Sequence, residues 1–206
     1  MNPYRLYLVT DDQQDLETLI WVVQEAVAGG VTMVQVREKH GDVRQFIDRA
    51  NAVKDVLKGT GVPLIINDRV DVALAVDADG VHLGQSDMPA ALARHLIGPD
   101  KILGLSIETK AQLEEAASLP VDYLGLSAIF STQTKTDTKT EWGIEGLRSA
   151  VNESHFPIVA IGGINASNLD DVVATNVDGI ALVSAICHAQ HPRKAAANIK
   201  AQIDRT

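Results

Sequence analysis

Short apolar runs alternate with amphipathic stretches along the whole chain. Eight runs are rich in Val, Ile and Leu, as buried parallel strands are, and each leads into a polar or glycine-rich corner and then a helical pattern. The runs span residues 5–10, 32–37, 63–67, 80–84, 102–106, 122–130, 157–163 and 179–186. Eight strands alternating with helical segments predict an α/β protein, a compact (β/α)₈ TIM barrel.

Four of the predicted helices have clear signals. Residues 15–28 place one apolar face at the 3.6-residue period, formed by Leu16, Leu19, Ile20, Val23 and Val27. Thr109 followed by Gln112 has the spacing of a capping box and opens a helix over 110–118. We expect Ser167 to cap a helix running to about residue 175, and residues 193–204 to form the closing helix.

The length predicts a single domain over residues 1–206 with little room between elements. Eight units share 206 residues, about 26 each, so the helices after the third and fourth strands must be short. The competing fold is an open doubly wound sheet. Because no Gly-x-Gly-x-x-Gly sequence opens a helix, the closed barrel is favoured.

The composition argues against several classes of binding partner. The chain has 18 Lys and Arg against 27 Asp and Glu, a net charge of −9, which argues against a nucleic-acid partner. Its single cysteine, Cys187, excludes a disulfide framework and is expected to be a small buried residue. No apolar run is long enough to span a membrane, and the start of the chain has no signal region, so we predict a cytoplasmic protein without a membrane partner.

Barrel active sites lie at the carboxyl ends of the strands, so the residues that end each run are candidates. Gln35, Arg37 and Lys39 follow the second run and would share one side if that strand continues to Lys39. The two cations could neutralise a phosphate or diphosphate. They could equally be a solvated strand end paired with Glu38 or Asp42, and the spacing leaves both interpretations open.

Carboxylates follow the third and fourth runs. Asp68 and Asp87 could each cap the next helix, with Pro89 early in the second of these helices. Together, however, they place two carboxylates on adjacent strand ends, and such oxygen ligands completed by water and phosphate oxygens suit Mg²⁺. The pair favours a metal site. His82, inside the fourth run, is expected to be a core or supporting residue.

Further polar residues follow the later runs. Ser106 ends the fifth run and could cap the next helix or meet a ligand. Gly162 and Gly163 allow backbone N–H groups to approach an anion, and Ser184 can open a short helix that adds donors, which predicts a phosphate site; alternatively the glycines only turn the chain.

The stretch "FSTQTKTDTKTEW" alternates threonine with polar residues, as an exposed strand does. In a barrel it must instead be the loop that leaves the sixth strand. Thr132, Thr134 and Lys135 would then lie over the barrel mouth, as part of a lid or of a solvated loop.

The motifs taken together resemble the thiamine phosphate synthase family. The resemblance runs over essentially the whole chain, in "VQVREK", "LIINDRVDVALAVDADGVHLGQSDMP", "GLSIET", "DYLGLSAIFSTQTKTD", "IVAIGGINASN" and "GIALVSAI". It implies a TIM-barrel transferase of thiamine biosynthesis that couples hydroxymethylpyrimidine diphosphate to a thiazole phosphate, with Mg²⁺ required and diphosphate released. It leaves a homo-oligomer open.

The resemblance also implies residue roles. Asp68 and Asp87 would hold Mg²⁺. The pyrimidine diphosphate would be bound by Gln35, Arg37, Lys39, Asn67, Ser106 and Lys135, of which Arg37, Lys39, Ser106 and Lys135 are the catalytic candidates. The thiazole phosphate would be bound by Thr132, Thr134, Gly163, Val183 and Ser184. One departure is Ser131, where the family usually has proline, which bears on the stiffness of the loop.

Three other activities fit the same scaffold. A thiazole tautomerase moves protons on one substrate and should not need the paired aspartates together with the threonine–lysine loop. A non-catalytic sensor of thiazole phosphate has no use for a diphosphate and Mg²⁺ set. A phosphosugar epimerase or isomerase should carry an acid–base pair at opposite strand ends.

Overall fold

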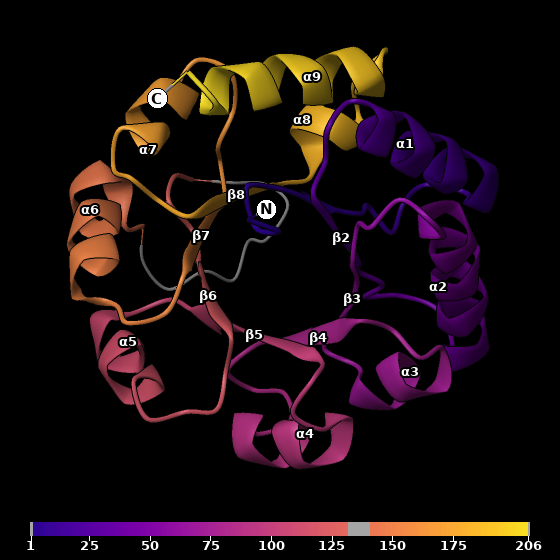
Figure 1. Ribbon diagram of the computed structural model, residues 1–206, viewed down its shortest axis with the longest axis horizontal. Coiled ribbons are helices and arrows are strands. Elements are labelled where there is room, and N and C mark those ends of the chain that lie inside the picture. The colour runs from indigo at the N-terminus through magenta and orange to yellow at the C-terminus, as the bar shows by residue number, and fades with distance from the viewer. Residues whose placement is uncertain (1, 132–140, 206) are drawn as a thin grey trace.

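The chain forms a closed barrel of parallel strands surrounded by helices. A computed structural model describes residues 2–131 and 141–205. The eight strands are neighbours in chain order from β1 to β8, and β8 pairs with β1 to close the cylinder. Figure 1 looks into this cylinder, with the helices arranged as a ring around it. The predicted (β/α)₈ barrel is confirmed, and the open doubly wound sheet is wrong.

Each strand lies within or almost within its predicted run. The strands are β1 Leu6–Val9, β2 Met33–Val36, β3 Leu64–Asn67, β4 Gly80–Leu83, β5 Ile102–Ile107, β6 Tyr123–Leu126, β7 Ile158–Ile161 and β8 Gly179–Leu182. The runs at 122–130 and 179–186 overestimate their strands, since β6 stops at Leu126 and β8 at Leu182. After β6 the apolar composition continues because residues 127–129 are also buried, whereas the run after β8 passes through exposed Ser184 before Ile186 is buried again.

The helices that follow the strands are α1 Leu16–Ala28, α2 Val43–Leu57, α3 Val70–Ala75, α4 Ala90–Ile97, α5 Lys110–Ala116, α6 Gly143–Glu153, α7 Leu169–Val173, α8 Ser184–Cys187 and α9 Pro192–Ile203. As expected, α3 and α4 are short. The capping box of Thr109 and Gln112 is confirmed. The predicted cap at Ser167 is wrong: α7 begins after Asn168, and the Ser167 hydroxyl hydrogen-bonds to Asn165 instead.

The apolar face predicted for α1 is partly wrong. Leu19 and Val23 are buried as expected, but Val22 and Ala26 are buried with them, whereas Leu16 is 42% exposed. The helix contacts α2 and α9, so its buried face is rotated relative to a face chosen by apolar spacing alone.

Apolar side chains fill two regions. The larger lies between the strands and the helices and is built almost wholly from Val, Ile, Leu and Ala. The smaller lies inside the cylinder and consists of Tyr7, Val9, Met33, Ile65, Tyr123, Val159 and Ala181. The two interior tyrosines are almost fully buried, so part of the scarce aromatic content lies at the centre of the barrel.

Gly104 makes room for two of these interior side chains. It pairs with His82 on β4 and with Tyr123 on β6, so all three positions face the same side of the sheet. A Cβ at Gly104 would lie 2.2 Å from Tyr123 Cζ and 2.5 Å from His82 Nδ1. The missing side chain on β5 therefore lets Tyr123 and His82 meet across it.

Cys187 is buried, as predicted. Its side chain lies in α8 at 5% exposure, and burial raises the pKa of the thiol to about 12. Among the helices formed by residues 2–131 and 141–205, none combines the length and apolarity that a membrane crossing requires.

We predict that Gly104→Ala lowers the free energy of unfolding by about 3 kcal/mol, because the added methyl overpacks the barrel interior. Urea unfolding measures the change. Gly59→Ala is the control: its position has φ 77° and no atom within 4 Å of a new Cβ. That variant carries only backbone strain of about 1 kcal/mol. Equal losses in the two variants would contradict the steric explanation.

Candidate active site

Two carboxylates and one ammonium group meet at the carboxyl ends of β2, β3 and β4. Lys39, three residues after β2, forms an ion pair with Asp68, the first residue after β3. The carboxyl group of Asp68 is also close enough to that of Asp87, which follows β4, to raise the pKa of Asp87. The Gly84 N–H donates to Asp87 Oδ2 at 2.7 Å and fixes that carboxyl group. The closed barrel thus gathers three of the predicted residues in one place.

The electrostatic environment of Asp87 is unfavourable to a second negative charge. Its half-buried position raises the pKa of the carboxyl group, and the neighbouring side chain and charge of Asp68 raise it further. The N–H of Gly84 and the charge of Lys39 act in the opposite direction without cancelling the rise. Two adjacent carboxylates with one lysine are therefore a site that gains from an added cation.

The helix-cap interpretations of both aspartates are wrong. The residue that precedes α3 is Arg69, and Asp68 has a φ of 61°, outside the geometry of an N-cap. Pro89 rather than Asp87 occupies the N-cap position of α4, where its own side chain makes no capping hydrogen bond. Both carboxyl groups are thereby directed to the mouth of the barrel and not to helix ends.

Arg37 and Lys39 do not lie on a continuation of β2, as they would if the strand extended to Lys39. The strand ends at Val36, so alternation does not continue to Lys39. The alternative pairing with Glu38 or Asp42 is also wrong, because Glu38 bonds Arg49 and Asp42 caps α2.

Arg37 lies on the same rim, held through its backbone. Its N–H donates to Thr10 Oγ1 at 3.1 Å. Its charge acts on Asp12, in the loop after β1. Burial opposes ionisation of Asp12, but hydrogen bonds from Gln13 and the Lys39 N–H, together with the Arg37 charge, leave the pKa of Asp12 below its ordinary value.

Three further predicted residues face the barrel interior below this rim. Gln35 is 4% exposed and donates to the Tyr7 hydroxyl at 2.7 Å. Asn67 is 6% exposed, and its Nδ2 has no hydrogen-bond partner within the described part of the chain. Ser106 Oγ lies 2.8 Å from His82 Nε2, and α5 is capped by Thr109, so Ser106 is not a helix cap. A buried amide without a partner is typical of a ligand site.

Sequence reasoning missed Ser127. It follows β6 and continues the alternate positions of Tyr123 and Gly125, which face the barrel interior. Its side chain is 7% exposed. Its Oγ, like Asn67 Nδ2, is buried without a hydrogen-bond partner among residues 2–131 and 141–205. The period-2 alternation from Tyr123 could have identified it, but the following apolar residues concealed the strand end.

The loops after β7 and β8 are neighbours because their strands pair. Ser184 begins α8, as expected, and Val183 precedes it. Gly162 and Gly163 have φ values of 101° and 68°. A Cβ at Gly163 would lie 2.6 Å from the Ser131 carbonyl oxygen, so glycine there lets the chain after β6 pass close to β7. Thr132, Thr134 and Lys135 lie outside the described residues.

The Asp68–Asp87 pair fits a Mg²⁺ ion. Across the described ranges, no group of three or more His, Cys, Asp and Glu side chains could hold a metal by itself. Two carboxylates that leave the remaining positions to water and phosphate oxygens are, however, the usual protein contribution to Mg²⁺ binding alongside a phosphorylated substrate. The raised pKa of Asp87 agrees with such a site.

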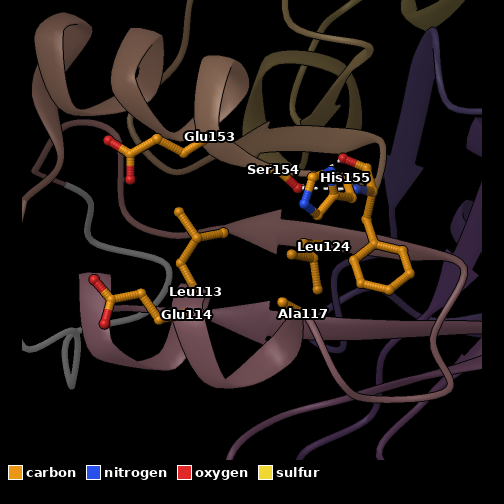
Figure 2. A pocket seen from close by; sticks show the side chains of 8 residues that line it. Leu113, Glu114, Ala117, Leu124, Glu153, Ser154 and His155 are labelled. Carbon is orange, nitrogen blue, oxygen red and sulfur yellow. Dashed lines mark hydrogen bonds between the residues drawn. The ribbon is translucent and has the colours of Figure 1, made fainter.

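A hollow of about 280 Å³ lies elsewhere, on the outer wall of the barrel. Figure 2 shows it between α5 and α6, with Leu113 and Ala117 on one side and Glu153 on the other. His155 and Phe156, which precede β7, place it towards the amino ends of the strands. It is therefore distinct from the mouth that holds Asp68 and Asp87.

Comparison with known proteins decides the family. A family model described as thiamine monophosphate synthase matches residues 6–186. The chain belongs to the thiamine monophosphate synthase family. The thiamine-phosphate synthase of Vibrio parahaemolyticus is 72% identical over 204 residues, covering 99% of this chain and 100% of that protein. The thiamine-phosphate synthase of Albidiferax ferrireducens is 53% identical, covering 99% and 94%.

Solved structures agree with the family. The thiamine phosphate pyrophosphorylase of Pyrococcus furiosus superposes with a TM-score of 0.88 at 37% identity, covering 99% of this chain and 97% of that one. A 3-hexulose-6-phosphate synthase reaches a TM-score of 0.72 at 15% identity, which shows the shared barrel alone. Thiamine-phosphate synthases are transferases, and the chain is an enzyme of that class.

The raised pKa of Asp87 yields a pH-dependent prediction. A carboxyl group whose pKa is higher in the folded than in the unfolded protein makes folding less favourable as pH rises through that interval. Asp87→Asn retains an oxygen that can accept from Gly84 and removes the charge. In EDTA, the variant should therefore gain unfolding free energy relative to the wild type as pH rises from below 3.8 to above the raised pKa.

Urea unfolding at several pH values in this interval measures that difference. Asp71→Asn is the control, because Asp71 is paired with Arg69 at the surface and its pKa is lowered by that hydrogen bond. The control should show the opposite trend with pH. A difference for Asp87→Asn that stays constant with pH would contradict the electrostatic account.

Proposed function

We propose that the enzyme couples 4-amino-2-methyl-5-hydroxymethylpyrimidine diphosphate with 4-methyl-5-(2-phosphoethyl)thiazole, or its 2-carboxy form. The reaction requires Mg²⁺ and gives thiamine phosphate and diphosphate, together with carbon dioxide when the thiazole carries the 2-carboxyl group. The observation that carries the proposal is the adjacency of Asp68, Asp87 and Lys39 at the barrel mouth of a thiamine monophosphate synthase family member.

The chemistry is a dissociative substitution. The bond between the pyrimidine methylene carbon and the diphosphate oxygen breaks, and its electron pair leaves with diphosphate. The thiazole nitrogen then donates its lone pair to the methylene carbon of the pyrimidine cation. No proton needs to be moved for this exchange, so the site must chiefly stabilise negative charge on the leaving group and keep water away from the cation.

The basic rim is suited to the first task. Arg37 and Lys39 follow β2, and Lys135 is predicted to join them from the loop after β6. The Lys39 side chain is 43% exposed, so its ammonium group can turn from Asp68 to an incoming anion. Mg²⁺ bound to Asp68 and Asp87 would neutralise further charge on the diphosphate.

The remaining residues divide between the two substrates. Gln35, Asn67 and Ser106 would bind the pyrimidine from within the barrel, where the unpartnered amide of Asn67 supports a ligand contact. The second group consists of Thr132, Thr134, Gly163, Val183 and Ser184 and would bind the thiazole phosphate. The neighbouring ends of β7 and β8 support that position, which is a frequent phosphate site in such barrels.

The rival activities fit the site less well. A thiazole tautomerase and a sensor of thiazole phosphate each lack a diphosphate, and neither gives a reason for two adjacent carboxylates beside a lysine. Phosphosugar enzymes among the solved neighbours share only the fold. Cytoplasmic location and a homo-oligomer stay predictions.

Mixing both precursors with the purified protein tests the proposal directly. We expect thiamine phosphate and diphosphate to form in equal amounts with Mg²⁺ and not in EDTA. Omission of either precursor should stop diphosphate release. Diphosphate release without the thiazole phosphate, or coupling at the full rate in EDTA, would overturn it.

We predict that Asp87→Ala lowers kcat/KM for coupling by about 100-fold or more, since the metal site loses one of its two carboxylates. Its melting temperature should change only modestly, because Asp87 caps no helix. Steady-state kinetics and thermal unfolding measure both quantities. Asp71→Ala, which breaks only the surface pair with Arg69, is the matched control and should retain wild-type activity. Full activity of Asp87→Ala would contradict the assignment.

A further inference from the structure

A continuous chain of hydrogen bonds crosses the barrel beneath the candidate site. Gln35 Nε2 donates to Tyr7 Oη at 2.7 Å, and the Tyr7 and Tyr123 hydroxyls are 2.9 Å apart. Tyr123 Oη lies 2.8 Å from His82 Nδ1, and His82 Nε2 lies 2.8 Å from Ser106 Oγ. We name these five residues the interior network. Both of its ends are residues assigned above to the pyrimidine.

Two glycines, on β5 and β6, leave space for the side chains of this network. Gly104 lies between His82 and Tyr123 in the sheet and leaves the space in which their side chains meet. A Cβ at Gly125 would lie 3.0 Å from His82 Cε1, so this second glycine accommodates the imidazole ring from the other side. The path from Tyr123 to Ser106 therefore depends on two positions without side chains.

The two tyrosines are the least exposed polar groups of the network. Tyr7 is 1% and Tyr123 0% exposed. Burial raises the pKa of both hydroxyl groups well above the ordinary value, so both are neutral phenols at physiological pH. Each hydroxyl then has one proton to donate, and a buried donor without an acceptor is unfavourable.

Because each hydroxyl has one proton, all hydrogen bonds of the network must donate in the same direction along it. When Gln35 donates to Tyr7, the Tyr7 proton goes to Tyr123 and the Tyr123 proton to His82 Nδ1. A neutral His82 then carries its hydrogen on Nε2 and donates it to Ser106 Oγ. Gln35 is left with a carbonyl oxygen, and Ser106 with an O–H group, for a ligand.

If donation runs in the opposite direction, the donor and acceptor roles of Gln35 and Ser106 are both exchanged. If the Gln35 amide turns over, its oxygen accepts from Tyr7, and every following bond is reversed up to Ser106, which then donates to His82. Gln35 now offers N–H and Ser106 offers lone pairs. In either direction the two ends have opposite hydrogen-bonding character, because a mismatch would leave a buried donor unpaired.

We propose that Tyr7, Tyr123 and His82 are positioning residues that couple the hydrogen-bonding character of Gln35 to that of Ser106 and thereby select an aminopyrimidine. The inference rests on the proposed function. A 4-aminopyrimidine offers an N–H donor beside ring-nitrogen acceptors, which matches a carbonyl at Gln35 together with an O–H at Ser106. A 4-oxopyrimidine offers an acceptor where the amino group was and meets the wrong partner.

Tyr123→Phe tests the coupling, because it keeps the aromatic ring and removes one hydroxyl from the middle of the network. We would measure inhibition of coupling by the 4-oxo analogue of the pyrimidine diphosphate and KM for the 4-amino substrate. In the variant, discrimination between the two should fall by about ten-fold, as expected when a polar partner is no longer fixed. KM for the thiazole phosphate should not change.

Tyr4→Phe is the matched control. The Tyr4 ring packs against Tyr123 in a tilted arrangement, with centroids 4.9 Å apart, but is not part of the network, so removing its hydroxyl should leave discrimination unchanged. Tyr7→Phe breaks the network at another bond and should reproduce the Tyr123→Phe result. Unchanged discrimination in a folded Tyr123→Phe or Tyr7→Phe protein would overturn the proposal.

A measurement on the wild type does not depend on the folding of any variant. Nitrogen-15 NMR of His82 in the complex with the pyrimidine diphosphate should show one neutral tautomer, protonated at Nε2. Exchange between tautomers, or protonation of both nitrogens, would overturn the proposal. Failure of the wild type to couple the two precursors would instead contradict the proposed function, so the two failures are distinguishable.

Discussion

The repulsion between Asp68 and Asp87 is the constraint around which the site is organised. Two carboxyl groups lie close together at the ends of adjacent strands, burial and Asp68 raise the pKa of Asp87, and Lys39 forms an ion pair with Asp68. A fold does not gain stability from such an arrangement. The closed barrel maintains it because β3 and β4 are fixed side by side, and the site becomes favourable when a cation is added.

The interior of the same barrel contributes polar residues to the base of the site. Most TIM-barrel interiors are filled by branched apolar side chains. Here two tyrosines and a histidine replace part of that packing, and Gly104 gives them space. Their hydrogen bonds extend from Gln35 on β2 to Ser106 on β5. Packing of the core and presentation of polar groups to a ligand are therefore not separate functions of these residues.

Much of the fold could be predicted from the sequence because its signals are local. Apolar runs separated by polar corners located all eight strands, and Thr109 with Gln112 marked the start of α5. The errors occurred where tertiary contacts decide. Leu16 is exposed because the buried face of α1 is directed towards α2 and α9. The N-cap position of α7 is occupied by Asn168 and not by Ser167. Neither effect can be read from spacing.

The site was predictable to the extent that strand ends indicate it. Asp68, Asp87 and Lys39 were identified from their positions after apolar runs, although the sequence left helix caps and other ion pairs open for them. Ser127 was missed because the run that contains β6 continues past the strand. The tyrosines of the interior network were missed for another reason. Their partners lie up to 116 residues apart in the chain, so only the closed cylinder brings them together.

The most direct measurement is a crystal structure with Mn²⁺, used as a substitute for Mg²⁺, and diphosphate, in which anomalous scattering locates the metal. The account predicts one ion in contact with the carboxyl groups of both Asp68 and Asp87 and with the diphosphate. An ion bound by the diphosphate at a position that neither carboxyl group reaches would contradict it.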